Sequence, residues 1–124
     1  MISFKFTKKT MHLILIVAFT LNLVWCFSPN FTQKGVASYY ASQFPGKRTA
    51  SGVIYHKDSL FCAHKTLKFG TVLKVVNLKN DSTVFLKVVD RLGKKSPHLI
   101  DVSYKAAQQL NFVRAGITQV EISY

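Results

Sequence analysis

The chain has 124 residues, which is the length of one domain. Its 17 basic and five acidic residues give a formal net charge of +12, a balance that suits an anionic polymer such as nucleic acid or an acidic cell envelope. The two cysteines and four histidines show no ligand spacing, so neither a metal site nor a cofactor is expected.

The N-terminal segment has the two parts of a secretory signal. Residues 1–12 hold three lysines and no acid, and an almost unbroken apolar run follows from Leu13 to Phe27. At 15 residues this run is shorter than the roughly 20 of a spanning helix. It is apolar all round, whereas a buried core helix would have one apolar face. We therefore predict a signal peptide over residues 1–28 and an exported protein.

The cleavage site has two alternatives. Residues 23–26 (LVWC) have the outline of a lipoprotein box, although Trp25 stands where a small residue is usual. A lipidated Cys26 would tether the domain to a membrane, and cleavage after Cys26 or Ser28 would release it. In either case Cys62 has no disulfide partner, and it is predicted to be a small buried hydrophobe.

Charge remains strongly positive without the signal. Removing residues 1–28 takes away three lysines, which leaves 14 basic and five acidic residues and a net charge of +9. The lysines are spread along the chain, and no nucleic-acid motif appears. Because an exported protein meets the envelope first, we expect an envelope polymer as partner and not nucleic acid.

After a short linker over residues 29–34, the chain is expected to be rich in β-strands. The residue types predict strands at 35–41, 60–64, 72–78, 84–89, near 99–101 and at 117–124. Segment 43–55 predicts a long exposed loop, and 79–82 predicts a hairpin turn. A helix is expected at 103–110, with Asp101 or Ser103 as its N-cap. We predict a mainly β fold, a small six-stranded closed barrel over residues 35–124, because closure removes exposed strand edges.

Two aspartates, Asp90 and Asp101, stand at the ends of apolar runs in a domain that is poor in acids. Carboxylates placed where strands finish are candidates for catalysis. The alternative is structural: Asp90 would pair with Arg91 or a lysine, and Asp101 would cap the helix. The residues alone leave these interpretations about equally supported.

Seven segments nevertheless match a known family in order and spacing: 35–40 (GVASYY), 48–52 (RTASG), 62–67 (CAHKTL), 69–71 (FGT), 76–78 (VNL), 89–91 (VDR) and 100–103 (IDVS). Over residues 35–124 the chain resembles the rare lipoprotein A (RlpA) family. The resemblance implies a double-psi β-barrel and an endolytic peptidoglycan transglycosylase that acts on glycan strands lacking stem peptides. One departure lies beside Asp90, where Leu92-Gly93 stands in place of the family's Gly-Pro.

The resemblance also implies site residues. His64 matches the family's active-site histidine, Asp90 its catalytic aspartate, and Asp101 a second acidic position that lines the same groove in related barrels. His64 would orient Asp90 or polarise the substrate, although a core histidine bonded to backbone is the alternative. The remaining substrate-binding candidates are polar or aromatic residues near these positions: Tyr39, Tyr40, Arg48, Thr49 and Arg91.

The chemistry of such an enzyme requires only one carboxyl group. Glycoside hydrolysis uses two carboxylates, but in a lytic transglycosylase the sugar's own 6-hydroxyl attacks the anomeric carbon and leaves a 1,6-anhydro end. The same group first protonates the leaving oxygen and then takes the hydroxyl proton. Two other functions stay open: a non-catalytic, expansin-like glycan-binding or wall-loosening module, and a basic structural or nucleic-acid-associated protein, which the signal disfavours. We expect a monomer.

Overall fold

The structure is a computed structural model, and it describes residues 31–41 and 45–124. The predicted signal peptide and both alternatives for its cleavage lie outside these residues. Within the described part of the chain, no helix is long and apolar enough to cross a membrane.

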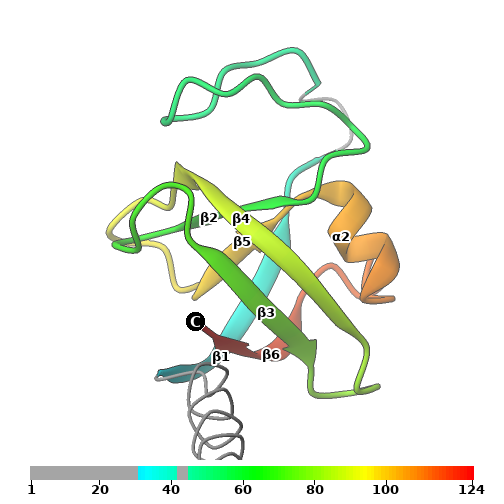
Figure 1. The fold of residues 1–124 in the computed structure, drawn as a ribbon. Coiled ribbons are helices and arrows are strands. Elements are labelled where there is room, and N and C mark those ends of the chain that lie inside the picture. The colour runs from blue at the N-terminus through cyan, green and yellow to red at the C-terminus, as the bar shows by residue number, and fades with distance from the viewer. Residues whose placement is uncertain (1–30, 42–44) are drawn as a thin grey trace, which may run out of the picture.

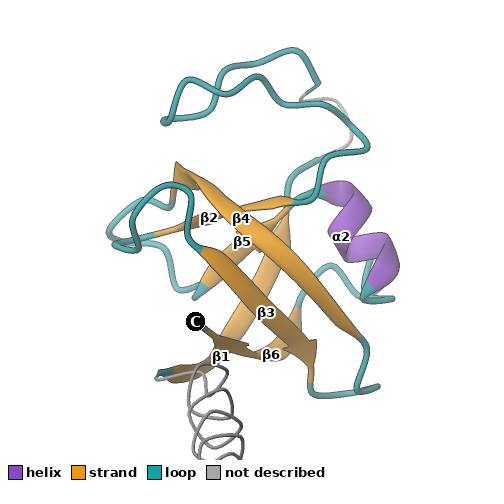
Figure 2. Ribbon diagram, in the orientation of Figure 1, coloured by secondary structure: helices purple, strands orange, loops and turns teal. Residues whose placement is uncertain are grey.

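Six strands and a short helix form a closed, mixed barrel, as the sequence predicts (Figures 1 and 2). The strands follow one another around the barrel in the order β1-β5-β2-β4-β3-β6. β1 runs parallel to β5 and β2 runs parallel to β4, whereas the other neighbours are antiparallel. The elements are β1 (Thr32–Tyr39), β2 (Phe61–His64), β3 (Val72–Asn77), β4 (Thr83–Arg91), β5 (Ile100–Val102), α2 (Tyr104–Gln109) and β6 (Thr118–Ser123).

The first strand begins earlier than the sequence suggests. Residues 32–34, expected in the linker, pair with residues 121–123 of β6. Their side chains are exposed and polar, so the segment lacks the apolar alternation that would predict a strand. Its pairing comes from backbone groups, which β6 leaves available along its whole length.

The barrel interior is filled by side chains from every strand. Alternate residues of β3, β4 and β6 point inward. They are Leu73 and Val75 in β3, Val84, Leu86 and Val88 in β4, and Val120 and Ile122 in β6. Cys62 belongs to the same core, and burial raises the pKa of its thiol to about 12. The prediction that Cys62 is a buried hydrophobe is therefore confirmed.

Helix α2 closes one side of the barrel and is capped by Ser103. The Ser103 side chain accepts a hydrogen bond from the backbone N–H of Ala106. Of the two predicted caps the structure therefore selects Ser103, which frees Asp101 for other contacts. At the far end of the helix, Nδ2 of the buried Asn77 donates to the Leu110 carbonyl at 2.8 Å, which fastens the helix to β3.

Gly35 is a position where the fold tolerates no side chain. A Cβ there would lie 2.7 Å from Cβ of Leu99, whose backbone N–H is fixed by a 2.8 Å bond to the Val36 carbonyl. We expect Gly35→Ala to lower the free energy of unfolding by about 1–3 kcal/mol, through overpacking. Gly93→Ala is the matched control, because no atom lies within 4 Å of its Cβ. Urea unfolding of both variants checks this, and equal losses would contradict it.

Candidate active site

A β-bulge in β4 turns Asp90 to the outside of the barrel. From Thr83 to Val88 the strand alternates between exposed and buried residues, with Val84, Leu86 and Val88 inside. Strict alternation would place residue 90 inside as well. The register with β2 shifts instead: Cys62 pairs with Val88 but Ala63 pairs with Asp90. The extra residue, Val89, packs on the outer side of the barrel, and the side chain of Asp90 lies on that side too. Bulges next to active sites often redirect a side chain in this way.

The outer side of the barrel therefore carries a row of four facing positions from four strands. Asp90 pairs with Ala63, Ala63 with Asp101, and Asp101 with Ser38. With neighbouring strands about 4.8 Å apart, the two aspartates lie two strand spacings from each other. The structure thus brings Asp90 and Asp101 to one face of the barrel.

The loop of residues 45–60, which precedes β2, arches over the end of the barrel at which β4 ends (Figure 1). The backbone N–H of Ala50 donates to Oδ1 of Asp90 at 2.8 Å, and that of Ser51 donates to the Val89 carbonyl at 3.0 Å. A short bridge between Arg48 and Ile54 stiffens the loop. Asp90 is therefore both a site residue and the point where this loop is attached.

A cavity of about 160 Å³ opens at Asp90. It is smaller than the roughly 300–1,000 Å³ of pockets that enclose a whole ligand, so it can take only part of a larger one. Tyr40, Tyr55 and Phe61 form its aromatic wall, with ring centroids 4.9–5.8 Å apart. The lining residues are Tyr40, Lys47, Arg48, Thr49, Tyr55, Phe61 and Asp90.

The Tyr40 hydroxyl donates a short hydrogen bond to Oδ2 of Asp90. Burial raises the pKa of the Tyr40 phenol far above its usual value, and the hydrogen bond to Asp90 and the charges of Asp90 and Asp101 raise this pKa further. Tyr40 is therefore a permanent donor. Together with the N–H groups of Ala50 and Arg91 it makes Asp90 the acceptor of three hydrogen bonds.

His64 lies away from this cavity. The residue is 4% exposed, and its Nδ1 accepts from the backbone N–H groups of Thr66 and Leu67 at 3.2 and 3.1 Å. Nδ1 therefore carries no proton, and Nε2 is buried without a hydrogen-bond partner in the described structure. Burial lowers the pKa of the imidazole, with the charges of Arg91 and Lys65 adding to the effect. No hydrogen bond joins His64 to Asp90 in residues 31–41 and 45–124; the hydrogen bonds of its ring there are with its own turn.

A neutral, buried His64 makes stability depend on pH. Its pKa is lowered below 6.5 in the folded state, so the unfolded chain binds more protons at pH values between the two. The contribution of the neutral His64 to the free energy of unfolding is therefore fully present above about pH 6.5, and it is lost as the pH falls towards the folded-state pKa. We expect the wild type to lose more melting temperature than His64→Asn between about pH 7.5 and pH 5. The Asn oxygen can still accept from the turn but does not titrate, and parallel melting curves for the two proteins would contradict this assignment.

Arg91 and Tyr39 point elsewhere. The Arg91 guanidinium lies 4.0 Å from the ring centroid of Phe69 and donates to the His64 carbonyl. Within the described residues the guanidinium forms no ion pair with Asp90. The alternative in which Asp90 is the structural partner of Arg91 is therefore wrong for these two side chains. The Tyr39 hydroxyl donates to the Val113 carbonyl at 2.8 Å, on the side of α2. The structure therefore does not bring Tyr39 to the cavity.

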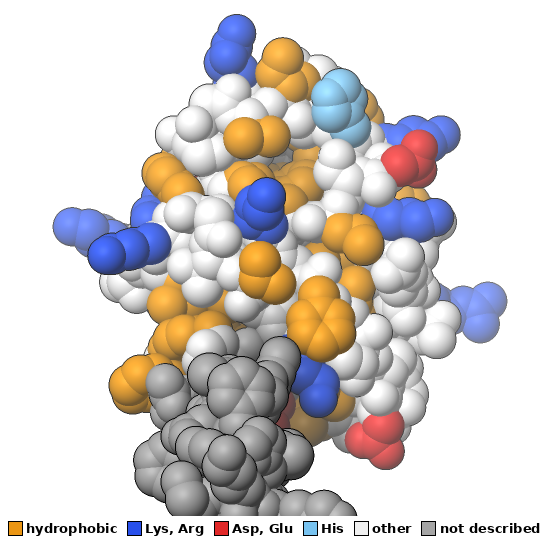
Figure 3. Space-filling view, viewed as in Figure 1, with side chains coloured by type: hydrophobic (Ala, Val, Ile, Leu, Met, Phe, Trp, Pro, Cys, Tyr) orange, Lys and Arg blue, Asp and Glu red, His pale blue; other side chains and the backbone are white. Residues whose placement is uncertain are grey.

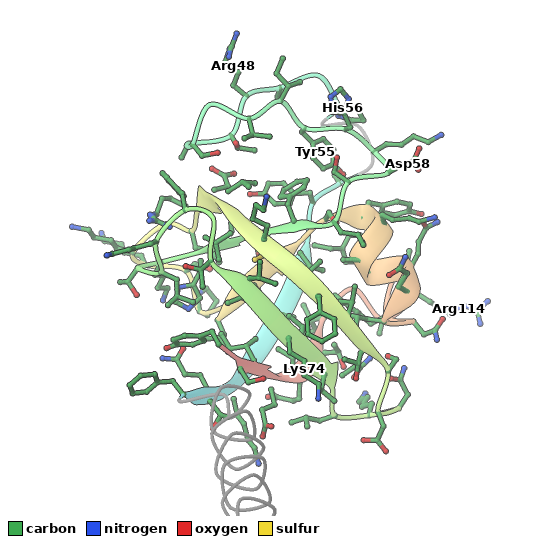
Figure 4. All side chains as sticks on the ribbon, in the orientation of Figure 1. Arg48, Tyr55, His56, Asp58, Lys74 and Arg114 are labelled. Carbon is green, nitrogen blue, oxygen red and sulfur yellow. The ribbon has the colours of Figure 1, made fainter. Side chains whose placement is uncertain are left out.

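Arg48 and Thr49 do line the cavity, from the loop. Arg48 donates from Nη1 to the Gly52 carbonyl, and Figure 4 shows its side chain pointing away from the barrel. The Thr49 hydroxyl donates to the Val53 carbonyl at 2.8 Å. Both residues hold the loop together at the cavity rim.

Asp101 forms a second polar cluster. The Ser38 hydroxyl donates to its Oδ1, and Nδ1 of His98 lies 2.8 Å from the Ser38 oxygen and 3.5 Å from Oδ1. Neither Ser38 nor His98 was predicted as a site residue, since nothing in the sequence links positions 60 residues apart. Phe61 was missed too, because an apolar strand residue predicts only core.

The surface carries dispersed basic side chains and one further cavity. Figure 3 shows Lys and Arg side chains scattered over the visible face, with no single basic tract. A larger cavity, about 320 Å³, lies beside α2 and the following segment, but no acid and no predicted site residue lines it.

The closed barrel with its outward carboxylates belongs to the double-psi β-barrel class. A family model described as "Lytic transglycolase" matches residues 32–122, and the chain belongs to this family, that of RlpA. The "Endolytic peptidoglycan transglycosylase RlpA" of Rickettsia bellii is 42% identical over 105 residues, which cover 79% of this chain and 46% of that protein. The protein of the same name from Campylobacter jejuni is 40% identical over 91 residues, 73% of this chain and 33% of that one. The chain thus spans less than half the length of each.

Solved structures agree on the fold. An expansin of Clavibacter michiganensis in complex with cellohexaose matches with a TM-score of 0.61 and 20% identity, covering 76% of this chain and 50% of that one. A Streptomyces papain inhibitor matches with a TM-score of 0.58 and 19% identity, covering 74% and 93%. At these identities the likeness extends to the fold alone.

Proposed function

We propose that the protein is an endolytic peptidoglycan lytic transglycosylase that leaves 1,6-anhydromuramyl ends. The observation that carries this proposal is the placement of Asp90: a bulge turns its carboxylate outward at a cavity with an aromatic wall, in a chain of the RlpA family. An aromatic wall beside a carboxylate suits a sugar ring, because the rings offer apolar faces and the carboxyl group reaches the glycosidic oxygen.

In this mechanism Asp90 is the acid and then the base. Its carboxyl group gives a proton to the leaving glycosidic oxygen as the bond to the anomeric carbon breaks. The 6-hydroxyl of the same muramyl residue attacks that carbon, and Asp90 takes the hydroxyl proton, so it ends the cycle protonated as it began. No water molecule is consumed, which separates this reaction from hydrolysis.

The neighbouring residues support this role in different ways. Tyr40 and the Ala50 N–H fix the two oxygens of Asp90. Arg48 and Thr49, at the rim of the cavity, are proposed to contact the glycan, and so is Asp101 on the same face. His64, buried and held by its own turn, is proposed to position the end of β2 next to Asp90.

We infer that the substrate is the peptidoglycan glycan strand, in its form lacking stem peptides, and that the protein works in the cell envelope. The net charge of +9 beyond residue 28 supports attraction to an anionic wall. Lipidation of Cys26 would keep the enzyme at a membrane, and the intact mass of the mature protein would decide between a diacylated and a free N-terminus.

The decisive experiment is incubation of the purified protein with glycan strands stripped of stem peptides, followed by mass spectrometry. New anhydromuramyl ends are the expected product. Products with reducing ends would indicate hydrolysis instead. Co-sedimentation with the strands and no cleavage would support a non-catalytic, wall-loosening module.

A further inference from the structure

The cluster around Asp101 has a fixed direction of hydrogen bonding. Ser38 has one hydroxyl proton and donates it to Oδ1 of Asp101, so its oxygen must accept from Nδ1 of His98. His98 therefore carries its proton on Nδ1 when it is neutral. A chain runs from His98 through Ser38 to Asp101, and it links the loop before β5 to β1 and β5.

This chain leaves two atoms unused, both of them acceptors. Oδ2 of Asp101 and Nε2 of His98 form no hydrogen bond with any residue in the described part of the chain. The side chains of both residues are 29% exposed, so a ligand can reach them. They are oriented in advance, because Ser38 holds the other end of each group.

We propose that Asp101 and His98, held by Ser38, form a saccharide subsite that takes an uncharged N-acetylhexosamine unit, next to the Asp90 cavity on the same face. This rests on the proposed function, because it assumes that the ligand is a peptidoglycan strand. With His98 neutral, both of these atoms are acceptors, so they require donors from the ligand, and sugar hydroxyl and acetamido N–H groups supply them. A carboxylate offers no donor and is repelled by Asp101.

Charge separates the two subsites. The Asp90 cavity has Lys47 and Arg48 in its lining, which suits the muramyl residue with its lactyl carboxylate. The Asp101 cluster presents a carboxylate instead, and Nζ of Lys65 donates a 2.7 Å hydrogen bond to the carbonyl of Ser96, two residues before His98. The alternating strand would therefore lie with its acidic sugar at Asp90 and its neutral sugar at His98.

The first test needs no substitution. The purified protein is titrated with the uncharged trisaccharide of N-acetylglucosamine while the histidine ring signals are followed by NMR. The His98 ring is expected to shift, and free N-acetylmuramic acid at the same concentration is expected to leave it unchanged. The proposal is overturned if the chemical shift of the His98 ring does not change at saturating trisaccharide, or if it changes equally with both sugars.

The second test separates binding from chemistry. Ser38→Ala and His98→Ala should each raise the KM for peptide-free glycan strands roughly 3–10-fold with kcat unchanged, the effect of losing one hydrogen bond that acts equally in ground and transition states. His56→Ala, at an exposed histidine on the covering loop (Figure 4), is the matched control. An unchanged KM in both variants, or a loss of kcat alone, overturns the proposal. If the wild type proves not to cleave, the NMR titration still decides whether the subsite exists.

Discussion

Asp90→Asn is expected to lower turnover by about 10²–10⁴-fold, which is the usual contribution of a general acid–base group. The amide keeps the size of the carboxyl group, and its oxygen can still accept from the N–H groups of Ala50 and Arg91, which Oδ1 accepts now. What it lacks is a proton to give and to take back. The loop should therefore stay attached and glycan binding should survive.

The measurement is the rate at which anhydromuramyl ends appear, together with the melting temperature of each protein. A variant with turnover near that of the wild type and a clearly lower melting temperature would show that Asp90 only attaches the loop.

Asp101→Asn is the control on the same face. Should it abolish turnover while Asp90→Asn does not, the acid–base role belongs to Asp101. His64→Ala is expected to reduce turnover less than Asp90→Asn, because a positioning residue transfers no proton to or from the substrate.

The positions of the strands along the chain and the hairpin turn could be predicted from the sequence, because each depends on residues that are neighbours in the chain. Alternation in 72–77 and 118–123 predicts which residues face the core, and those residues are buried. The turn residue Asp81 adopts the left-handed backbone (φ 59°) expected of Asn and Asp in hairpins. These features follow from local chemistry, and the barrel follows from closing such strands.

The face on which Asp90 lies could not be read in this way. Alternation from Val84 to Val88 would put residue 90 inside, and only the bulge against β2 reverses this. The bulge depends on pairing between residues more than 25 positions apart, which local sequence does not specify. The resemblance singled out Asp90, but the reason that its side chain is accessible is tertiary.

The two adjacent tyrosines show the same limit. Successive side chains of a strand point to opposite faces, so Tyr39 and Tyr40 could not both reach one site. The sequence offers no sign of which one does. The register of β1 with β5, in which Ser38 faces Asp101 and Tyr39 faces Val102, puts Tyr39 with the helix and Tyr40 with Asp90.

Tyr40→Phe is expected to lower kcat roughly 10–100-fold, the effect of removing one hydrogen bond to a charged group. The phenylalanine ring keeps the contacts with Tyr55 and Phe61, so the aromatic wall and the KM should change little. The loss would fall on the carboxyl group itself, because Oδ2 of Asp90 would lose its donor and could rotate away from the glycosidic oxygen.

Tyr39→Phe is the matched control, since it removes the same atom from the neighbouring residue on the opposite face. That hydroxyl donates to the Val113 carbonyl, so its loss should cost about 0.5–1.5 kcal/mol of unfolding free energy and leave kcat at the wild-type value. Steady-state kinetics and urea unfolding of the two variants give four numbers. The assignment requires kcat to fall in Tyr40→Phe alone. A fall of similar size in both would mean that the hydroxyls act through general stability, and a fall in Tyr39→Phe alone would place the site on the helix side of the barrel.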